Sequence, residues 1–389
     1  MPNCDFAIHA SQLFDGDHIR KNASVLVKNG AILDVVSGKA QNAITLKEDA
    51  LLAPGFIDCQ VNGGDGVMFN DDPSPETIAT IADAHRRFGV TSFLPTFISD
   101  TREKMRMAIA AVDEVISQGQ LSVLGIHLEG PFLNPKRRGA HAQEHIAGAR
   151  ADDIDLLSSL KKGTTLVTLA PEVMPEGFIS ALKQRGIIIC AGHTDARSEE
   201  IETALQQGVR GFTHLYNAMS QMTSRAPGAV GACLADSESF AGIIADGHHV
   251  SAEALRVALK SKTARKLFLV SDAMASFGTE LKSFSLFGEK IYVERGRLST
   301  ASGTLAGAQL DIASAMRFMI KHAGATLNEA LTMTSSTPAT FLRLENKIGR
   351  IAPGLRADFI VLDASLSVSE YWVAGQNFSA QSLALNMRA

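Results

Sequence analysis

Four short apolar segments of this chain each end in a side chain that can bind a metal ion or transfer a proton. The segments cover residues 121–129, 186–193, 208–214 and 267–272, and their last residues are Glu129, His193, His214 and Asp272. An apolar run of about five to eight residues is typical of a strand buried on both faces of a parallel sheet. In a β/α barrel the active site lies at the carboxyl ends of such strands. We therefore expect these four side chains to face one site.

Helical patterns alternate with the apolar segments between residues 54 and 344. The expected helices cover Ser74–Phe88, Arg102–Gln118, Glu199–Gln207, Ala252–Lys260 and Ala308–His322. Strands that alternate with helices are typical of an α/β fold with a parallel sheet, because each helix forms the crossover connection between two parallel strands. The pattern predicts a (β/α)8 TIM-like barrel over residues 54–344.

Both ends of the chain show the alternation of a half-buried strand instead. Residues 6–17 and 23–38 alternate in this way, with Gly16 and the Asn29-Gly30 pair as turn signals, and residues 349–363 resemble them. We expect residues 1–53 and 345–389 to pair into one small β-sandwich domain beside the barrel.

Composition and charge narrow the class of protein. The chain has 389 residues, of which 46% are hydrophobic and 20% charged, enough for one large domain and a smaller one. A formal net charge of -4 gives no electrostatic reason to expect a nucleic acid or an anionic membrane as partner. No segment reaches the roughly 18 uninterrupted apolar residues of a spanning helix. Four scattered cysteines form no C-x-x-C pair, so we expect a cytoplasmic protein without disulfides.

The residue types at the strand ends suit a catalytic metal. A single buried histidine is more often a hydrogen-bonded core residue than a ligand, but two histidines and a glutamate in the same structural position are a stronger signal. Two imidazoles and one carboxylate suit Zn²⁺ or Fe²⁺, and three protein ligands leave a coordination position open for water. We expect one divalent cation per chain, with Zn²⁺ as the first choice and Fe²⁺ accepted by the same ligands.

Several longer motifs carry a family resemblance. They are PGFIDCQVNG (54–63), GIHLEGPFLNPKRRGAH (125–141), AGHTDA (191–196), THLYNAMS (213–220), RAPG (225–228), ADGHHV (245–250), LVSDAM (269–274) and TLAG (304–307). Together they resemble the N-acetylglucosamine-6-phosphate deacetylase family of the amidohydrolase superfamily. HLEGPF followed by THLYNAM is specific to that family, whereas PGFID and ADFIVLD mark only the superfamily.

The resemblance implies a reaction and roles for its residues. The reaction is hydrolysis of N-acetylglucosamine 6-phosphate to glucosamine 6-phosphate and acetate, in amino-sugar catabolism or cell-wall sugar recycling. Glu129, His193 and His214 would bind the metal, Asp272 would act as general base and then acid, and His141 would face the carbonyl oxygen. A metal-bound water is acidic enough to attack an amide near neutral pH, which is why such a reaction needs the cation.

The resemblance also implies substrate contacts and a second subunit. The expected contacts are Ala140, His141, Asn217, Ala218, Arg225, Asp246, Gly247, His248, His249, Leu305, Ala306 and Gly307. Asn217, Ala218 and Arg225 would bind the phosphate, with Arg225 reaching the neighbouring active site of a homodimer. Taken alone, Arg225 and the run Lys136–Arg138 are better explained as solvated surface charges.

One departure from the superfamily pattern bears on the number of metals. Many amidohydrolases end the first barrel strand in His-x-His, which binds a second metal, whereas Gln60 and Asn62 occupy those positions here. Amide oxygens are weaker ligands than imidazoles for a transition metal. These two residues mark a vacated second-metal site, and the resemblance is therefore to the mononuclear branch of the family.

Two alternatives stay open at this stage. The enzyme could act on a different amide, such as that of N-acetylgalactosamine 6-phosphate, because the sequence does not place the loops that read one sugar hydroxyl. A non-catalytic sugar-phosphate sensor would keep the fold, but it would have no need for an intact ligand set together with an acid-base carboxylate.

Overall fold

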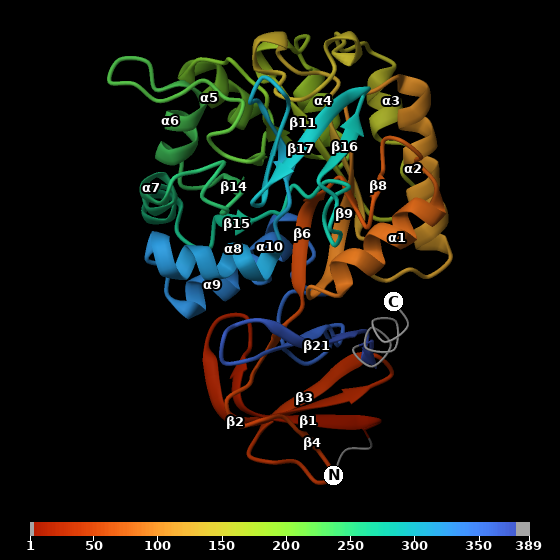
Figure 1. The fold of residues 1–389 in the computed structure, drawn as a ribbon, viewed down its shortest axis with the longest axis vertical. Helices are drawn as coiled ribbons and strands as arrows, with labels where there is room; N and C mark the ends of the chain where they lie inside the picture. Colours follow the sequence, from red (N-terminus) through yellow and green to blue (C-terminus); the bar gives the residue numbers. More distant parts are fainter. Residues whose placement is uncertain (1–3, 379–389) are drawn as a thin grey trace.

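A computed structural model describes residues 4–378 and shows a barrel resting on a smaller sheet domain (Figure 1). The barrel sheet has eight parallel strands, and each strand pairs with the next one in chain order. They are β6 (Phe56–Val61), β9 (Val90–Ile98), β10 (Gly125–Glu129), β11 (Thr164–Leu169), β12 (Ile188–Ala191), β13 (Gly211–Phe212), β14 (Phe240–Ile243) and β15 (Leu267–Leu269). A bridge between Val61 and Ala273 joins the two edges, which confirms the expected barrel.

Helices surround the barrel strands (Figure 1). They are α1 (Pro75–Arg86), α2 (Arg102–Ser117), α3 (Asp153–Leu157), α4 (Phe178–Gln184), α5 (Ser198–Gln207), α6 (Gly228–Ala235), α7 (Ala252–Lys262), α8 (Ile312–Phe318), α9 (Leu327–Thr334) and α10 (Ser336–Phe341). Four single-turn helices are η1 (Pro135–Arg137), η2 (Gln143–His145), η3 (Pro171–Val173) and the π-helical η4 (Met319–Ala323). Among residues 4–378, no helix has both the length and the apolar character that crossing a membrane requires.

Local sequence explains where several of these helices begin. Ser74, Thr101 and Ser251 each accept a hydrogen bond from a backbone N–H in the first turn of α1, α2 and α7, and Pro75 starts α1. The last expected helix is wrong at its start, because residue 308 belongs to a strand. Asp311 caps α8 instead, with its carboxylate accepting from the N–H of Ser314.

The small domain is one eight-stranded sheet to which both chain ends contribute. Its strands are β1 (Phe6–Phe14), β2 (Ile19–Lys28), β3 (Ala31–Ser37), β4 (Ile44–Thr45), β5 (Leu51–Pro54), β20 (Phe359–Leu362), β21 (Val368–Val373) and β22 (Gln376–Asn377). Antiparallel pairing of β5 with β20 joins the two ends, and Trp372 packs in one apolar cluster with Ile8 and Val25. The division into 1–53 with 345–389 and 54–344 stays a prediction, and residues 1–3 and 379–389 lie outside the described residues.

A further small sheet follows β15 and covers part of the barrel's open end (Figure 1). Its antiparallel strands are β16 (Ser283–Leu286), β17 (Glu289–Glu294), β18 (Arg297–Ser299) and β19 (Leu305–Ala308). A two-stranded ribbon, β7 (Gly63–Gly64) with β8 (Val67–Met68), follows β6. Ala308 also pairs with Ala273 beyond β15, which fixes the small sheet against the carboxyl end of the barrel. The sequence patterns did not predict this sheet.

Candidate active site

Three of the four side chains predicted at strand ends lie just beyond their strands. Glu129 is the last residue of β10, but β12, β13 and β15 end two or three residues before His193, His214 and Asp272. The backbone φ angles of these three residues are 49°, 33° and 48°, in the left-handed region. Such a conformation ends the extended strand and costs about 1–3 kcal/mol for a residue with a side chain. The expected strands were therefore too long at these positions.

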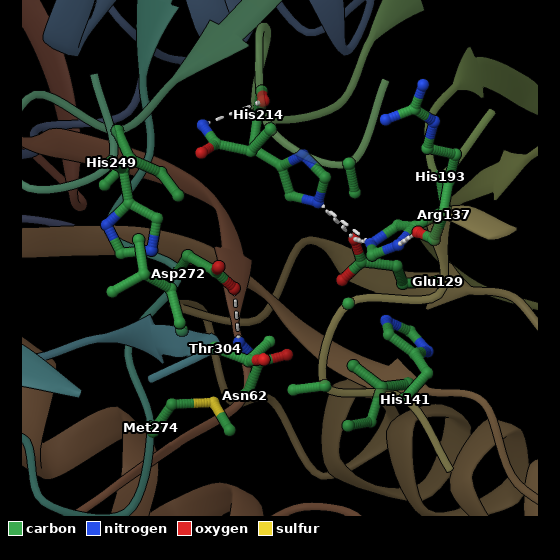
Figure 2. Close-up of a pocket in the computed structure, with 18 of the residues that line it drawn as sticks. Asn62, Glu129, Arg137, His141, His193, His214, His249, Asp272, Met274 and Thr304 are labelled. Atoms are coloured by element: carbon green, nitrogen blue, oxygen red, sulfur yellow. Dashed lines mark hydrogen bonds and ion pairs between the residues drawn. The ribbon is translucent and has the colours of Figure 1, made fainter. Parts of the chain in front are cut away.

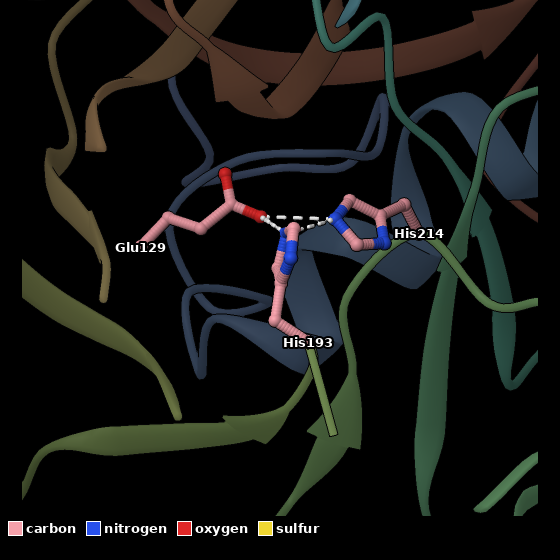
Figure 3. Close-up of side chains that lie close together, drawn as sticks. All are labelled: Glu129, His193 and His214. Atoms are coloured by element: carbon pink, nitrogen blue, oxygen red, sulfur yellow. Dashed lines mark hydrogen bonds and ion pairs between the residues drawn. The ribbon is translucent and has the colours of Figure 1, made fainter. Parts of the chain in front are cut away.

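Glu129, His193 and His214 converge from three separate strands (Figure 3). The Nε2 atoms of the two histidines are 3.1 Å apart, and they lie 3.3 Å (His193) and 3.0 Å (His214) from Oε1 of Glu129. All three side chains are buried. Although burial opposes ionisation, the adjacent His193 and His214 hold the pKa of Glu129 well below its ordinary value. The group is thus an anionic carboxylate facing two imidazole nitrogens.

The hydrogen bond of His193 fixes which of its ring nitrogens is free. Its Nδ1 lies 2.8 Å from the backbone carbonyl oxygen of Arg137, which can only accept, so Nδ1 carries the proton. A neutral His193 then presents a lone pair on Nε2 to Glu129 and His214. A carbonyl partner of this kind is the usual support of a metal-binding histidine. This donor set, with its lone pair directed at the centre, fits a divalent transition metal.

Asp272 lies beside this triad and accepts hydrogen bonds on one oxygen (Figure 2). Its Oδ1 is 2.7 Å from Nδ2 of Asn62 and 3.1 Å from Nε2 of Gln60. Burial, with the negative charge of Glu129 added, raises the pKa of Asp272 to about 6. A carboxyl group with a pKa near neutrality can both accept and return a proton.

His141 is a neutral imidazole on the other side of the triad. The N–H of Ser99 donates to its Nδ1 at 3.3 Å, and the Ser99 hydroxyl lies 2.8 Å from the same nitrogen. Since Nδ1 accepts a hydrogen bond, the ring proton is on Nε2. Burial, together with the adjacent His193, lowers the pKa of His141 to about 3. His141 is therefore suited to donate a hydrogen bond to an oxygen that gains negative charge, without being an acid itself.

These groups line one cavity of about 360 Å³, the size of a small-molecule site (Figure 2). Of the site residues predicted from sequence, those in its wall are Asn62, Glu129, Ala140, His141, His193, His214, Asn217, Ala218, His249, Asp272, Leu305 and Gly307. Those outside the wall are Gln60, Arg225, Asp246, Gly247, His248 and Ala306. The remaining wall residues, which the predicted site did not include, are Ile98, Lys136, Arg137, Gly139, Ile244, Met274, Leu286 and Thr304.

Two of the residues outside the wall support or adjoin residues within it. Asp246 accepts from the backbone N–H of His249 at 2.8 Å and contacts its Nδ1 at 2.7 Å, which orients that ring toward the cavity. Gln60 lies behind the wall and contacts both Glu129 and Asp272. In contrast, Arg225 is in the exposed segment 221–227 and does not line the cavity of its own chain.

Glu172 organises the loops around His193 and was missed in the sequence. Its carboxylate accepts from Asn134 Nδ2 at 2.9 Å, from the Thr194 hydroxyl at 2.6 Å and from the N–H of Asp195 at 2.7 Å. It therefore joins the loop that follows His193 to the loop that carries Arg137. The only signal in the sequence is its position just after an apolar strand, Thr164–Leu169, of the same kind as the strands that precede the ligands.

Asp58 is a buried carboxyl group beneath the site. Its Oδ1 accepts from the backbone N–H groups of Gln60 at 3.1 Å and Ser271 at 3.2 Å, and so it ties the end of β6 to the segment that carries Asp272. Its Oδ2 is buried and has no partner among the described residues. Burial raises the pKa of Asp58 to about 7.

Comparison with known proteins agrees with this geometry. The sequence matches the amidohydrolase family over residues 51–383, and the chain belongs to that family. Members of this family are metal-dependent, and the buried Glu129, His193 and His214 form a group that could bind the metal.

Similar proteins are named as deacetylases of N-acetyl amino-sugar 6-phosphates. An N-acetylgalactosamine-6-phosphate deacetylase from Shewanella sp. (strain ANA-3) is 38% identical, covering 96% of this chain and 97% of the relative. An N-acetylglucosamine-6-phosphate deacetylase from Haemophilus influenzae is 34% identical, covering 88% and 91%. The crystal structure of N-acetylglucosamine-6-phosphate deacetylase from Pasteurella multocida superposes with a TM-score of 0.92 at 31% identity, covering 96% of this chain and 99% of that one.

The raised pKa of Asp58 predicts a specific dependence of stability on pH. Between its ordinary pKa of 3.8 and about 7, the folded chain keeps a proton that the unfolded chain has released, so the folded state loses stability as the pH rises through this window. Asp58→Asn keeps the acceptor oxygen and removes the titration. Relative to this variant, the unfolding free energy of the wild type should fall by about 3–4 kcal/mol between pH 4 and pH 8.

Urea unfolding at a series of pH values measures this difference. Asp49→Asn, at an exposed position, is the matched control for the loss of one carboxylate and is measured over the same pH series. Parallel curves for Asp58→Asn and the wild type would show that Asp58 does not titrate in this window.

Proposed function

We propose that this protein hydrolyses the acetamido group of N-acetylglucosamine 6-phosphate, with acetate and glucosamine 6-phosphate as products. The observation that carries the proposal is the convergence of a carboxylate-diimidazole triad, Asp272 and His141 on one cavity. Relatives at 34% and 31% identity over most of the chain bear this activity in their names.

The proposed reaction needs a metal ion, and the triad of Glu129, His193 and His214 would bind it. We infer that Glu129, His193 and His214 hold one divalent cation per chain, with Zn²⁺ the expected ion and Fe²⁺ compatible with the same donors. When bound, the cation would polarise the carbonyl group and lower the pKa of water. The presence of Gln60 and Asn62 at the end of β6 is the reason for proposing a single ion, because neutral amides bind a second one weakly.

The remaining steps belong to the chain's own side chains. Asp272 takes a proton from the water molecule that attacks the acetyl carbon, and returns it to the sugar nitrogen as the carbon–nitrogen bond breaks. The Nε2–H of His141 donates to the carbonyl oxygen while it carries negative charge. A proton on the nitrogen is required because an amine, unlike its anion, is an adequate leaving group.

We propose that the phosphate lies near Asn217 and Ala218, with Arg225 supplied by a second subunit. Asn217 and Ala218 line the cavity, whereas Arg225 of the same chain lies in the exposed segment 221–227. A homodimer that places this segment over the neighbouring cavity would supply a guanidinium group to bind the phosphate.

We also place the reaction in the cytoplasm, because the buried cysteines Cys59, Cys190 and Cys233 are free thiols, which suits a reducing compartment.

N-Acetylgalactosamine 6-phosphate is the second candidate substrate. The relative that is 38% identical over 96% of this chain carries that name, although relatives with the glucosamine name are 34% and 31% identical. The two sugars differ only in the orientation of one hydroxyl group. Contacts to that hydroxyl decide between them, and the acetamido chemistry is the same for both.

Acetate release from a panel of sugars tests the function. We expect turnover of N-acetylglucosamine 6-phosphate to exceed that of the galactose epimer and of the sugar without phosphate, and we expect a chelator to abolish it and Zn²⁺ to restore it. Coupled detection of acetate gives kcat and KM for each sugar. A higher kcat/KM for the galactose epimer would favour the second candidate, and no acetate from any sugar would contradict both.

The proposed role of Asp272 predicts the effect of one substitution. Asp272→Asn keeps the size of the side chain but cannot accept a proton, so kcat should fall by about 10²–10⁴-fold. Metal content and KM should change little, because the triad is intact. Near-normal turnover, measured by acetate release, would remove Asp272 from the acid-base role.

Mixed dimers test the proposed role of Arg225 across an interface. Arg225→Ala should raise KM by about 10- to 100-fold, since a hydrogen bond to a charged group contributes about 1.5–3 kcal/mol. A hybrid of an Arg225→Ala subunit with an Asp272→Asn subunit has one intact site only if Arg225 serves its neighbour.

Such hybrids, prepared by co-expression with two affinity tags, should recover about half of the wild-type kcat/KM, measured at low substrate concentration, because one of their two sites is complete. Each homodimer serves as the control. A hybrid that is no more active than the two homodimers, or a monomeric protein, would contradict the arrangement.

A further inference from the structure

Gln60 and Asn62 project from the end of β6 toward two carboxylates. Nε2 of Gln60 is 3.1 Å from Oε2 of Glu129 and 3.1 Å from Oδ1 of Asp272, so one amide group joins both. Nδ2 of Asn62 is 2.7 Å from the same Oδ1 (Figure 2). Gln60 is 2% exposed and Asn62 is 1% exposed. We refer to these two side chains as the amide pair.

The carboxylates fix the orientation of both amides. A carboxylate oxygen can only accept, so each amide must turn its nitrogen toward it; the opposite orientation would place two oxygens in contact. Because Gln60 has two N–H groups on one nitrogen, it can donate one to Glu129 and the other to Asp272. The Oδ1 atom of Asp272 thus receives two donors, and these bonds do not involve its Oδ2.

The backbone of the same strand end also holds Asp272. The N–H of Asp272 donates to the carbonyl of Gln60 at 3.0 Å, and the N–H of Asn62 donates to the carbonyl of Ala273 at 2.9 Å. These bonds keep Asp272 in its left-handed conformation with a φ of 48°. With the backbone fixed, rotation of the carboxylate is the remaining freedom, and the two amides act on that rotation.

We propose that the amide pair positions the acid-base carboxylate. Two donors hold Oδ1 of Asp272 so that Oδ2 is the oxygen that exchanges a proton, and Gln60 at the same time fixes Glu129 relative to Asp272. Gln60 and Asn62 are positioning residues, since they act through Asp272. The role in turnover depends on the deacetylase function proposed above, whereas the contact of Gln60 with Glu129 also has a consequence for metal binding.

The two residues should differ in a way that a general loss of structure would not produce. Among the described residues, the side chain of Asn62 hydrogen-bonds to Asp272 and not to Glu129. Asn62→Leu should therefore lower kcat by about 10- to 100-fold, the effect of losing a hydrogen bond to a charged group, with KM within about threefold of the wild type. Its affinity for Zn²⁺ should be unchanged. Gln60→Met should lower kcat to a similar degree and also weaken Zn²⁺ binding by about 10-fold, because the support of Glu129 is lost.

The measurements are kcat and KM by acetate release, Zn²⁺ per chain after dialysis, Zn²⁺ affinity by competition with a chromophoric chelator, and the thermal midpoint. Gln309→Met is the matched control. Its amide donates to the backbone carbonyls of Ser276 and Thr279 and lies outside the cavity wall. This variant should lose some thermal stability and keep the wild-type kcat and Zn²⁺ affinity.

The outcomes separate this inference from the proposed function. Failure of the wild type to release acetate would reject the function, while equal Zn²⁺ affinities of Gln60→Met, Asn62→Leu and the wild type would reject the link to Glu129. An active wild type with kcat unchanged in both amide variants, or with KM alone raised, would reject the positioning role. If Asn62→Leu does not fold, Gln60→Met decides the question by the same two measurements.

Discussion

The site depends on the register of parallel strands in the barrel. Cys190 of β12 pairs with Gly211 of β13, and His193 and His214 each follow three residues later, so the two histidines reach the same level of the barrel. Glu129, at the end of β10, faces them from across the site. A slip of one residue would turn the side chains of a strand to the opposite face. The many apolar contacts that fix the barrel register therefore also fix the distances among three ligands.

Hydrogen bonds from the surrounding loops then decide the protonation of each ring. The carbonyl of Arg137 places a proton on Nδ1 of His193, and the N–H of Ser99 places one on Nε2 of His141. One imidazole thus offers a lone pair, and the other offers an N–H. The two rings pack edge to face with centroids 4.5 Å apart, yet their chemical roles differ because their backbone partners differ.

Much of the fold, and the residues of the triad, could be predicted from the sequence. The apolar strand pattern located the barrel, and the types of residue that follow the strands located Glu129, His193 and His214. Hydrophobic periodicity does not encode a positive φ, so the left-handed turns at the histidines were missed and the strands were drawn too long. Glu172 was missed because its role is to join loops distant in sequence. The sheet β16–β19 was missed because its strands are short and partly exposed, with a weak apolar alternation.

The sheet β16–β19 gives the cavity a wall that is separate from the barrel. Leu286, Thr304, Leu305 and Gly307 come from this sheet and its turns, while the triad comes from barrel strands. Replacement of Leu286, Thr304 or Leu305 changes the shape of this wall while the triad stays on the barrel strands, whereas a Cβ at Gly307 would lie 2.8 Å from the backbone oxygen of Asp272. Related enzymes can therefore diverge in sugar preference by changing this one segment. An engineer who wishes to alter selectivity can vary residues 283–306 and keep Gly307 and Ala308, which adjoin Asp272.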